Sequence, residues 1–311
     1  MQQNKNSAAG YSLAVLASVT FSAKGILAKL VYGYGVDPET LLALRFLLAA
    51  PLFWLALYFF PGPRVSAKDM AILALSGFIG LFCAAMANFY GLLYIDASLE
   101  RIILYVYPSI VAILTLVFFK EKAGVRFWVS IAVIYAGLAI TLKLHEGVGR
   151  SEFIGASLVF ISAVIFAVSY LVTESIGARV SSVRMSAYTT TTATFAFVGA
   201  WAFEGAPIPR SPDVWWLLLI MAVVCTFISV LATVMCIKKL GARRAAVAGM
   251  IGPVSTVLLA YLILGETIDA VQAIGMTLVM AGVLAISLQT VTDAGLSKRG
   301  VQPDGLSAER D

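Results

Sequence analysis

Four charged residues lie in or beside long apolar runs of this sequence, where a charge is expensive. They are Lys24, Arg45, Glu100 and Arg101. An ionisable group at the centre of a membrane helix costs about 2.5–3.5 kcal/mol, so its presence indicates a polar cavity or a charged partner. We expect Glu100 to stay ionised and to pair with Lys24, Arg45 or Arg101. The group would then have an excess of cations, which suits a ligand that carries a carboxylate.

Two interpretations of these charges remain open. Arg45 and Arg101, together with Lys29, have side chains long enough to reach the membrane surface from within a helix. Lys24 lies some two-thirds of the way across the membrane toward the outer face and Glu100 is short, so neither reaches the surface easily. Lys24 therefore either contacts a substrate or a coupling ion, or forms a structural pair with Glu100.

Other polar and aromatic residues within the apolar runs are candidates for lining the same cavity. Tyr side chains and small polar groups can orient a ligand, although each can also serve packing alone. Pro108 and Pro253 each remove one backbone hydrogen bond from a helix, which leaves a carbonyl free to line a cavity or to bond a neighbour. The polar and aromatic candidates are Asn88, Tyr90, Tyr105, Tyr107, Ser169, Tyr170 and Thr233.

The composition shows what must position these residues. Of the 311 residues, 60% are hydrophobic and 13% are charged, whereas a soluble domain carries about 25% charged residues. A soluble protein is therefore excluded, and most of the exterior must face lipid. The net charge of +5 is too small to indicate a nucleic-acid partner.

Ten charge-poor stretches are long enough to be membrane helices, which need about 20 apolar residues. The runs lack the alternation of barrel strands, and the connections between them are too short for a soluble domain. We therefore predict an all-α polytopic membrane protein with a polar, disordered tail over residues 293–311. The predicted spans are 6–23, 46–63, 71–95, 102–119, 127–142, 153–173, 185–203, 214–237, 245–265 and 270–292.

The basic residues predict the orientation of these spans. Lys and Arg in short loops favour the cytoplasm. Ten spans put both termini on one side, where fifteen basic residues collect against three on the other, so we expect both termini to be cytoplasmic. The fifteen are Lys5, Arg64, Lys68, Lys120, Lys122, Arg126, Arg179, Arg184, Lys238, Lys239, Arg243, Arg244, Lys298, Arg299 and Arg310, against Lys143, Arg150 and Arg210.

The sequence also repeats itself with a displacement of 145 residues. Pro108 then aligns with Pro253, and Glu121 aligns with Glu266. This predicts two five-helix units, residues 1–146 and 147–292. An odd number of spans inverts the second unit, and inverted repeats are typical of secondary transporters. Under the same displacement each of the four charges falls on a neutral residue, so the charges belong to the first unit only: Lys24 aligns with Ser169, Arg45 with Thr190, Glu100 with Ala245 and Arg101 with Ala246.

Several motifs of the two units resemble the EamA family of the drug/metabolite transporter superfamily. They are Arg45-Phe46, residues 97–101 with Pro108, residues 120–122 and residues 265–267. The resemblance covers about residues 10–290. It implies ten helices, cytoplasmic termini, a central cavity between the halves, and export or exchange of amino acids, small metabolites or drugs.

The remaining features point away from catalysis. Cys83, Cys225 and Cys236 have no metal-binding spacing, the single histidine is His145, and no nucleotide-binding loop is present. Glu121 and Glu266 each follow an apolar run, and we expect them to end a helix or fix a turn. We therefore predict no enzyme activity, no metal, no cofactor and no nucleic-acid partner.

The sequence thus predicts a secondary active transporter of the bacterial inner membrane that works by alternating access. Its partners would be a small-molecule substrate, the lipid bilayer and protons as the candidate coupling ion, and we expect a monomer or a weak homodimer. The alternative is an uncoupled facilitator or a channel-like pathway for small polar solutes. Glu100 favours proton coupling, unless its carboxylate is permanently paired.

Overall fold

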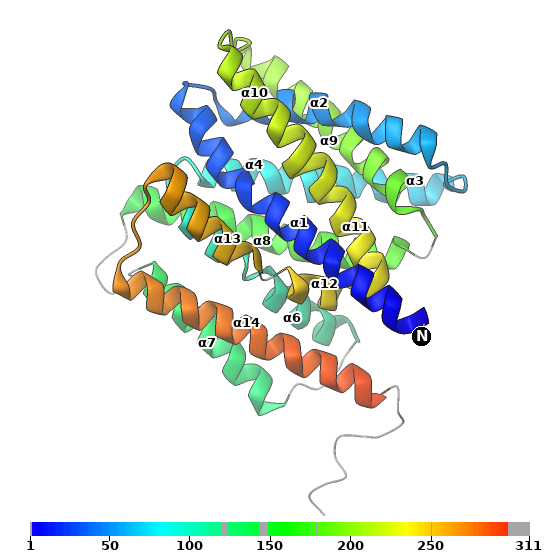
Figure 1. Cartoon of the computed structure of the whole chain (residues 1–311), viewed down its shortest axis with the longest axis vertical. Coiled ribbons are helices and arrows are strands. Elements are labelled where there is room, and N and C mark those ends of the chain that lie inside the picture. Colours follow the sequence, from blue (N-terminus) through cyan, green and yellow to red (C-terminus); the bar gives the residue numbers. More distant parts are fainter. Residues whose placement is uncertain (1, 120–123, 143–148, 178, 250, 298–311) are drawn as a thin grey trace, which may run out of the picture.

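The computed structural model describes residues 2–119, 124–142, 149–177, 179–249 and 251–297. Helices are the only regular elements in these ranges (Figure 1). In chain order they are α1 (Gln2–Gly33), α2 (Pro38–Phe59), α3 (Ala67–Ser76), η1 (Gly77–Cys83), α4 (Ala84–Gly91), α5 (Ala97–Leu104), α6 (Tyr107–Phe119), α7 (Val125–Thr141), α8 (Arg150–Gly177), α9 (Ser182–Glu204), α10 (Pro212–Ile220), η2 (Met221–Ile228), α11 (Ser229–Leu240), α12 (Ala242–Ala248), α13 (Ile251–Leu259), η3 (Ala260–Leu264) and α14 (Ala270–Ser297).

Seven helical stretches in the described ranges are long and apolar enough to cross a membrane by length and composition. They are Ala9–Gly33, Pro38–Phe59, Ala67–Gly91, Ala97–Phe118, Arg150–Gly177, Pro212–Leu240 and Arg244–Leu264. Val125–Thr141 and Ala270–Ile286 are apolar but shorter. The predicted span 185–203 lies in α9, whose run of threonines at 189–192 makes it more polar. The all-helical membrane character is therefore confirmed, while the count of ten spans stays a prediction.

Helix α2 begins earlier than the sequence predicts. Asp37 caps its first turn by accepting from the backbone N of Thr40 at 2.7 Å, and Pro38 occupies the first helical position. The predicted start at residue 46 is wrong, because the charge of Arg45 ends the apolar run but does not end the helix. Arg45 instead lies about two turns inside α2, since a turn holds about 3.6 residues.

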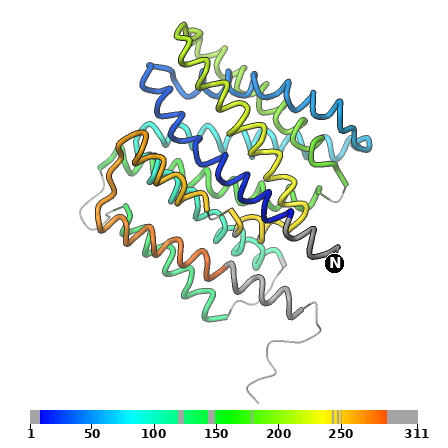
Figure 2. Tube along the Cα trace, in the orientation of Figure 1, coloured from blue at the N-terminus to red at the C-terminus, as the bar shows by residue number. Residues whose placement is uncertain are grey.

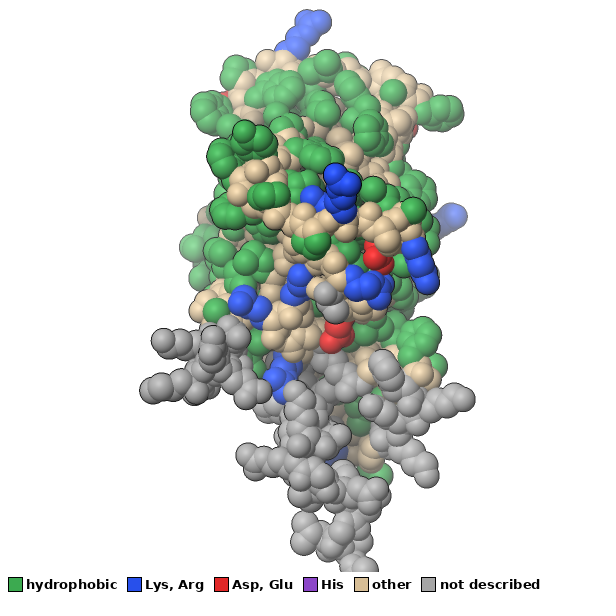
Figure 3. Space-filling view, turned by 90° about the vertical axis from the view of Figure 1, so that its right-hand side faces the viewer, with side chains coloured by type: hydrophobic (Ala, Val, Ile, Leu, Met, Phe, Trp, Pro, Cys, Tyr) green, Lys and Arg blue, Asp and Glu red, His purple; other side chains and the backbone are tan. Residues whose placement is uncertain are grey.

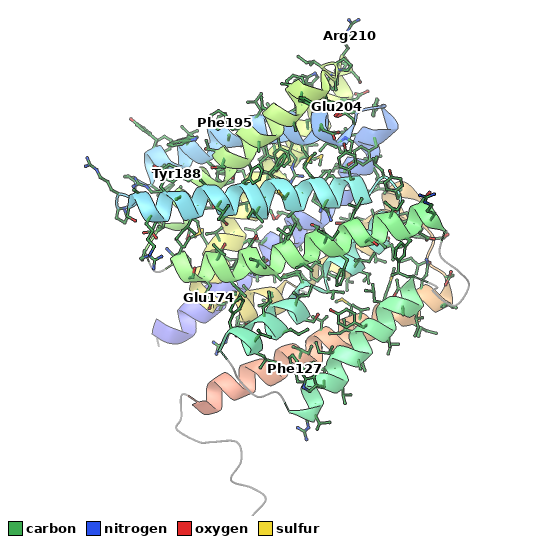
Figure 4. The ribbon with its side chains drawn as sticks, turned by 180° about the vertical axis from the view of Figure 1, so that it is seen from behind. Phe127, Glu174, Tyr188, Phe195, Glu204 and Arg210 are labelled. Atoms are coloured by element: carbon green, nitrogen blue, oxygen red, sulfur yellow. The ribbon has the colours of Figure 1, made fainter. Side chains whose placement is uncertain are left out.

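Helices from distant parts of the sequence pack against each other. Helix α1 lies beside α11 and α13, α8 lies beside α4 and α6, and α2 lies beside α9. Figure 2 shows α1 in blue next to α11 in yellow, although some 200 residues separate them. Seen from behind in Figure 4, α4 and α8 run side by side. The first and second halves of the chain are thus interleaved.

Helices α7 and α14 form a closely packed pair at one edge of the molecule (Figure 1). Glycines permit this approach, because a methyl group at Gly137 would lie 2.8 Å from the carbonyl oxygen of Gly275 and 2.8 Å from Cβ of Leu278. Small residues allow helix backbones to approach closely in a membrane. This pair therefore depends on the absence of a side chain at Gly137.

The molecular surface separates apolar sides from a basic end. Phe195 and Phe203 on α9 are 75% and 94% exposed, as expected for side chains that face lipid. Figure 3 looks at the end of the molecule that carries the N-terminus, and Lys and Arg side chains gather there with few acidic ones between them. Exposed basic residues near this end are Arg64, Lys68, Arg126, Arg179, Lys238 and Lys239.

Candidate functional site

A cavity of about 160 Å³ lies between elements of the two halves of the chain. One buried water needs about 10–15 Å³, so this space holds several waters or a small organic molecule. Eight of the residues proposed from the sequence line it: Lys24, Arg45, Asn88, Tyr105, Tyr107, Ser169, Tyr170 and Thr233. On α1 the lining runs from Ala14 to Lys24, and on α11 it reaches Ile237, one turn before the helix ends. The cavity therefore extends from Lys24 toward the end of the molecule that carries the N-terminus.

Lys24, Asn88 and Glu100 form a closed polar group at the inner limit of this cavity. Nζ of Lys24 donates to Oε1 of Glu100 at 3.1 Å and to Oδ1 of Asn88. Nδ2 of Asn88 donates to the same Oε1 atom at 2.6 Å. The three residues are 3%, 1% and 1% exposed. Glu100 thus pairs with Lys24, which is one of the three partners that the sequence left open.

Arg45 is held by neutral groups. Its Nε donates to Oγ1 of Thr226 at 2.6 Å, and its Nη2 donates to the carbonyl oxygen of Cys225 at 3.1 Å. Both acceptors belong to η2, a π-helical segment whose wider turn leaves backbone carbonyls available to other partners. Thr226 in turn donates to the carbonyl of Met221 at 3.0 Å. Arg45 from α2 therefore bridges the two halves of the chain.

Arg101 lies behind the cavity wall and does not line the cavity. Its guanidinium carbon is 4.9 Å from the ring centre of Phe21 and 4.8 Å from that of Tyr105, within the range of a cation–π contact. Nη2 makes long contacts of 3.5 Å to the carbonyl of Ser18 and 3.4 Å to Oγ of Ser22. Arg45 and Arg101 are 3% and 1% exposed, so the interpretation that they reach the membrane surface is wrong. Lys29 is half-buried.

The two prolines stand in the first turns of α6 and α13. A break at Tyr105 and Val106 precedes Pro108, and a break after Ala248 precedes Pro253. Each proline thus lies in the first turn of a new helix, where its missing N–H costs no bond. The carbonyl of Gly249, four residues before Pro253, accepts from the hydroxyls of Ser18 and Tyr105. The free carbonyl expected from the sequence thus exists and is satisfied by neighbours.

Two further tyrosines close one side of the cavity. The hydroxyl oxygens of Tyr107 and Tyr170 are 3.4 Å apart, and their rings are 5.0 Å apart between centres. Tyr107 comes from α6 and Tyr170 from α8. Tyr90 is half-buried on α4 and does not line the cavity. Glu100, Pro108 and Pro253 do not line it either.

Glu266 closes the opposite end of the bundle. Its carboxylate accepts from the backbone N of Ala97 at 2.8 Å, from the backbone N of Ser98 at 3.0 Å and from Oγ of Ser98 at 2.7 Å. A carboxylate at this position satisfies free N–H groups of the first turn of α5 and complements the helix dipole. The expectation that Glu266 ends a helix or fixes a turn did not include this contact with the other half. Glu121 lies outside the described residues, as does His145.

Sequence reasoning also missed the residues that hold Arg45 and Tyr105. Thr226, Cys225, Ser18 and Gly249 are neutral residues inside apolar runs, and a serine or threonine in a helix commonly bonds its own backbone. The one available signal was the spacing of Ser18 and Ser22, which puts two small polar residues on one face of α1. Among the described residues, no group of three or more His, Cys, Asp or Glu side chains is placed to hold a metal ion.

Comparisons with known proteins identify a transporter family and a shared fold. The model of the EamA-like transporter family matches the chain twice, over residues 8–143 and 153–288. The uncharacterized transporter YcbK of Bacillus subtilis (strain 168) is 28% identical over 281 residues, which cover 87% of this chain and 90% of YcbK. The uncharacterized transporter YyaM of the same organism is 26% identical over 269 residues, with coverages of 84% and 88%. One crystal structure shares the fold, with a TM-score of 0.66 and 20% identity over 90% of this chain and 98% of that chain.

Proposed function

Because this chain belongs to the EamA-like transporter family, we propose that it is a secondary active transporter that moves small organic metabolites across a membrane by alternating access. The observation that carries the proposal is the cavity, which is lined by both halves of the chain and ends at a buried charged group. A site between two halves becomes accessible from one side and then from the other when the halves rock.

An inverted repeat is the construction that we propose for these halves, over residues 1–146 and 147–292. The two family matches are displaced by 145 residues, which is 153 less 8 and 288 less 143. Helix packing has the same symmetry. The displacement of 145 residues relates α1 to α8, α4 to α11 and α6 to α13. Helix α1 packs on α11 and α13, and its counterpart α8 packs on α4 and α6. The π-helical segments η1 and η2 also fall on each other under this displacement. These correspondences support ten spans related by a twofold axis in the membrane plane.

The topology that we propose has both termini in the cytoplasm of a bacterial inner membrane. Exposed Lys and Arg side chains gather at the end that carries the N-terminus (Figure 3), and basic loops favour the cytoplasmic side. Arg150 and Arg210 are the exposed basic residues of the other end within the described ranges. In this orientation the cavity extends from Lys24 toward the cytoplasmic side, where an exporter or exchanger collects its substrate.

Protons are the coupling ion that we propose, with Glu100 as the group that carries them. Its Oε2 atom is buried and makes no hydrogen bond to any described residue, whereas Oε1 accepts from Lys24 and Asn88. Movement of Lys24 during the transport cycle would remove the cation that favours the ionised carboxylate. One proton can then bind in one state and leave in the other.

An uncoupled facilitator is the alternative function, and a specific observation favours it. Glu100 already has a cation within hydrogen-bonding distance, and that cation opposes protonation of the carboxylate. If this pair persists throughout the cycle, no other carboxylate is left to carry a proton, because no described Asp or Glu lines the cavity. The protein would then only equilibrate its substrate across the membrane.

Purified protein in proteoliposomes distinguishes these functions. The vesicles are loaded with the standard amino acids together with small organic acids and amines, and the release of each solute is measured with and without an imposed pH gradient. A coupled transporter drives at least one solute beyond equal concentrations when the gradient is present. A facilitator stops at equal concentrations, and release no faster than from protein-free vesicles would contradict both functions.

A further inference from the structure

The charges that face the cavity are all positive among the described residues. Lys24 and Arg45 line the cavity, and no described Asp or Glu does. A ligand that enters therefore meets cationic donors and no carboxylate. This separates the cavity from one built for amines, in which an acidic side chain would face the ligand.

The two cations are not equivalent. Lys24 has a full countercharge, because Glu100 lies 3.1 Å from it. Arg45 has only the neutral oxygens of Thr226 and Cys225, and its Nη1 atom makes no hydrogen bond to any described residue. A buried charge is unfavourable unless an opposite charge compensates it. Arg45 is therefore the group at which a bound anion contributes most.

The walls around Arg45 are largely aromatic. Its guanidinium carbon lies 5.6 Å from the ring centre of Phe46 and 5.5 Å from that of Phe89. Phe21, Tyr105 and Phe166 also line the cavity. Apolar walls with few fixed polar groups are typical of pockets that bury the apolar body of a small ligand and orient it through its polar end.

We propose that this cavity takes a small organic anion with one carboxylate and an apolar body, and that the guanidinium of Arg45 receives the carboxylate. A guanidinium is suited to this role because its donors match the two oxygens of a carboxylate. In the state that the structure shows, Lys24 is paired with Glu100. An α-ammonium group has no free carboxylate to meet, so the site favours an organic acid over the corresponding amino acid and rejects the corresponding amine. The inference that this is the transported substrate rests on the function proposed above.

Equilibrium binding to the purified full-length protein tests this proposal without any transport step. Four probes share one phenyl group and differ in charge: 3-phenylpropionate, 3-phenylpropionamide, phenylalanine and phenethylamine. Calorimetry should give an affinity for 3-phenylpropionate at least about tenfold above that for the amide, because a hydrogen bond to a charged group is worth about a factor of ten or more. Its affinity should also exceed that for phenylalanine, because the cavity offers no carboxylate among the described residues to compensate the ammonium group. Phenethylamine should not bind.

Variants of Arg45 complete the experiment. Arg45→Gln should lower the affinity for 3-phenylpropionate by about tenfold or more and leave the affinity for the amide unchanged. Arg45→Lys should give an intermediate loss, because lysine keeps the positive charge but lacks the paired N–H donors of a guanidinium. Arg210→Gln is the matched control, because Arg210 is exposed at the far end of the bundle (Figure 4).

Three results would overturn the proposal: equal affinities for the acid and the amide, tighter binding of phenylalanine, or no effect of either Arg45 variant. Absence of any binding by 3-phenylpropionate would overturn it as well. The proteoliposome experiment uses mixed solutes, so the transport function can hold while this substrate class fails.

Discussion

Nδ2 of Asn88 lies 2.6 Å from Oε1 of Glu100, and the same carboxylate oxygen receives Nζ of Lys24 at 3.1 Å. Asn88 also accepts from Lys24 through its amide oxygen. Three side chains from α1, α4 and α5 therefore contact one another in a ring. Removing any one of them leaves a buried polar atom without its partner, which is more costly than never having buried the group.

Removing one charge of this ring should destabilise the protein more than removing both. Lys24→Met or Glu100→Gln alone leaves one buried charge unpaired, which costs about 3–5 kcal/mol, whereas replacing a complete pair costs little. Thermal unfolding of the purified variants measures this difference. The double variant should recover most of the stability and still fail to accumulate solute under a pH gradient. A double variant as unstable as the sum of the single ones would contradict the pairing.

Thr226→Val should weaken the hold of η2 on Arg45. Valine has nearly the same shape as threonine but offers no oxygen to Nε of Arg45, which lies 2.6 Å from the hydroxyl. An unsatisfied buried donor costs about 1–3 kcal/mol, and the unfolding temperature should fall accordingly. Thr277→Val is the control, because Thr277 is exposed on α14 and bonds only its own helix backbone. Equal effects of the two substitutions would show that Arg45 does not depend on Thr226.

Glu266→Gln should open the end of the bundle that lies away from the N-terminus. The variant loses the charge that complements the first turn of α5, and a helix cap of this kind contributes about 0.5–2 kcal/mol. Access to the cavity is measured by the rate at which a membrane-impermeant thiol reagent modifies Cys225 in whole cells, with Cys83 and Cys236 replaced by serine. The rate should rise in Glu266→Gln. Glu204→Gln, an exposed glutamate at the end of α9 (Figure 4), should leave it unchanged.

Gly137→Ala should disturb the pair of helices α7 and α14. The added methyl group would lie 2.8 Å from the carbonyl oxygen of Gly275, and overpacking of this kind costs about 1–3 kcal/mol. Gly199→Ala is the control, because Gly199 lies within α9 with open space around it. That change should be neutral or stabilising, since alanine favours a helix over glycine. Thermal unfolding of both variants tests the difference, and equal stabilities would contradict the close contact.

Asp96, in the connection before α5, should make stability depend weakly on pH. Partial desolvation raises the pKa of Asp96, the Glu266 carboxylate raises it further, and Lys29 lowers it. The folded protein then binds a proton more readily than the unfolded chain, so the free energy of unfolding should fall as the pH rises from about 3.9 through the raised value. Unfolding temperatures across this range should show a smaller decline in Asp96→Asn. A steeper decline in the variant would contradict this assignment.

The sequence predicted the charged part of the site better than its neutral part. Lys24 and Glu100 stand out because a charge in an apolar run needs an explanation, and the structure brings them together. Thr226 and Gly249 give no such signal, because a neutral residue is common in a membrane helix and only the fold shows that its oxygen faces Arg45 or Tyr105. The contact of Glu266 with Ser98 joins residues 168 apart in sequence and could not be read from either segment alone.

The boundaries of the helices were less predictable than their existence. A helix that buries Arg45 in the protein continues through the charge, so the end of an apolar run does not mark the end of α2. The breaks before Pro108 and Pro253 were only partly predictable for a similar reason. A proline forbids one hydrogen bond, but it does not specify whether the helix bends or ends.

The π-helical form of η2 has a consequence for how this chain tolerates the loss of a residue. A bond from residue i to i+5 encloses one residue more than an α-helical bond, so deletion of one residue within η2 would convert the segment to an ordinary helical turn. Helices α10 and α11 would keep their faces, while the Cys225 carbonyl and the Thr226 hydroxyl would no longer both meet Arg45. The direction of the Arg45 guanidinium therefore depends on the one extra residue in the π-helical turn of η2, and not on a charged side chain in η2.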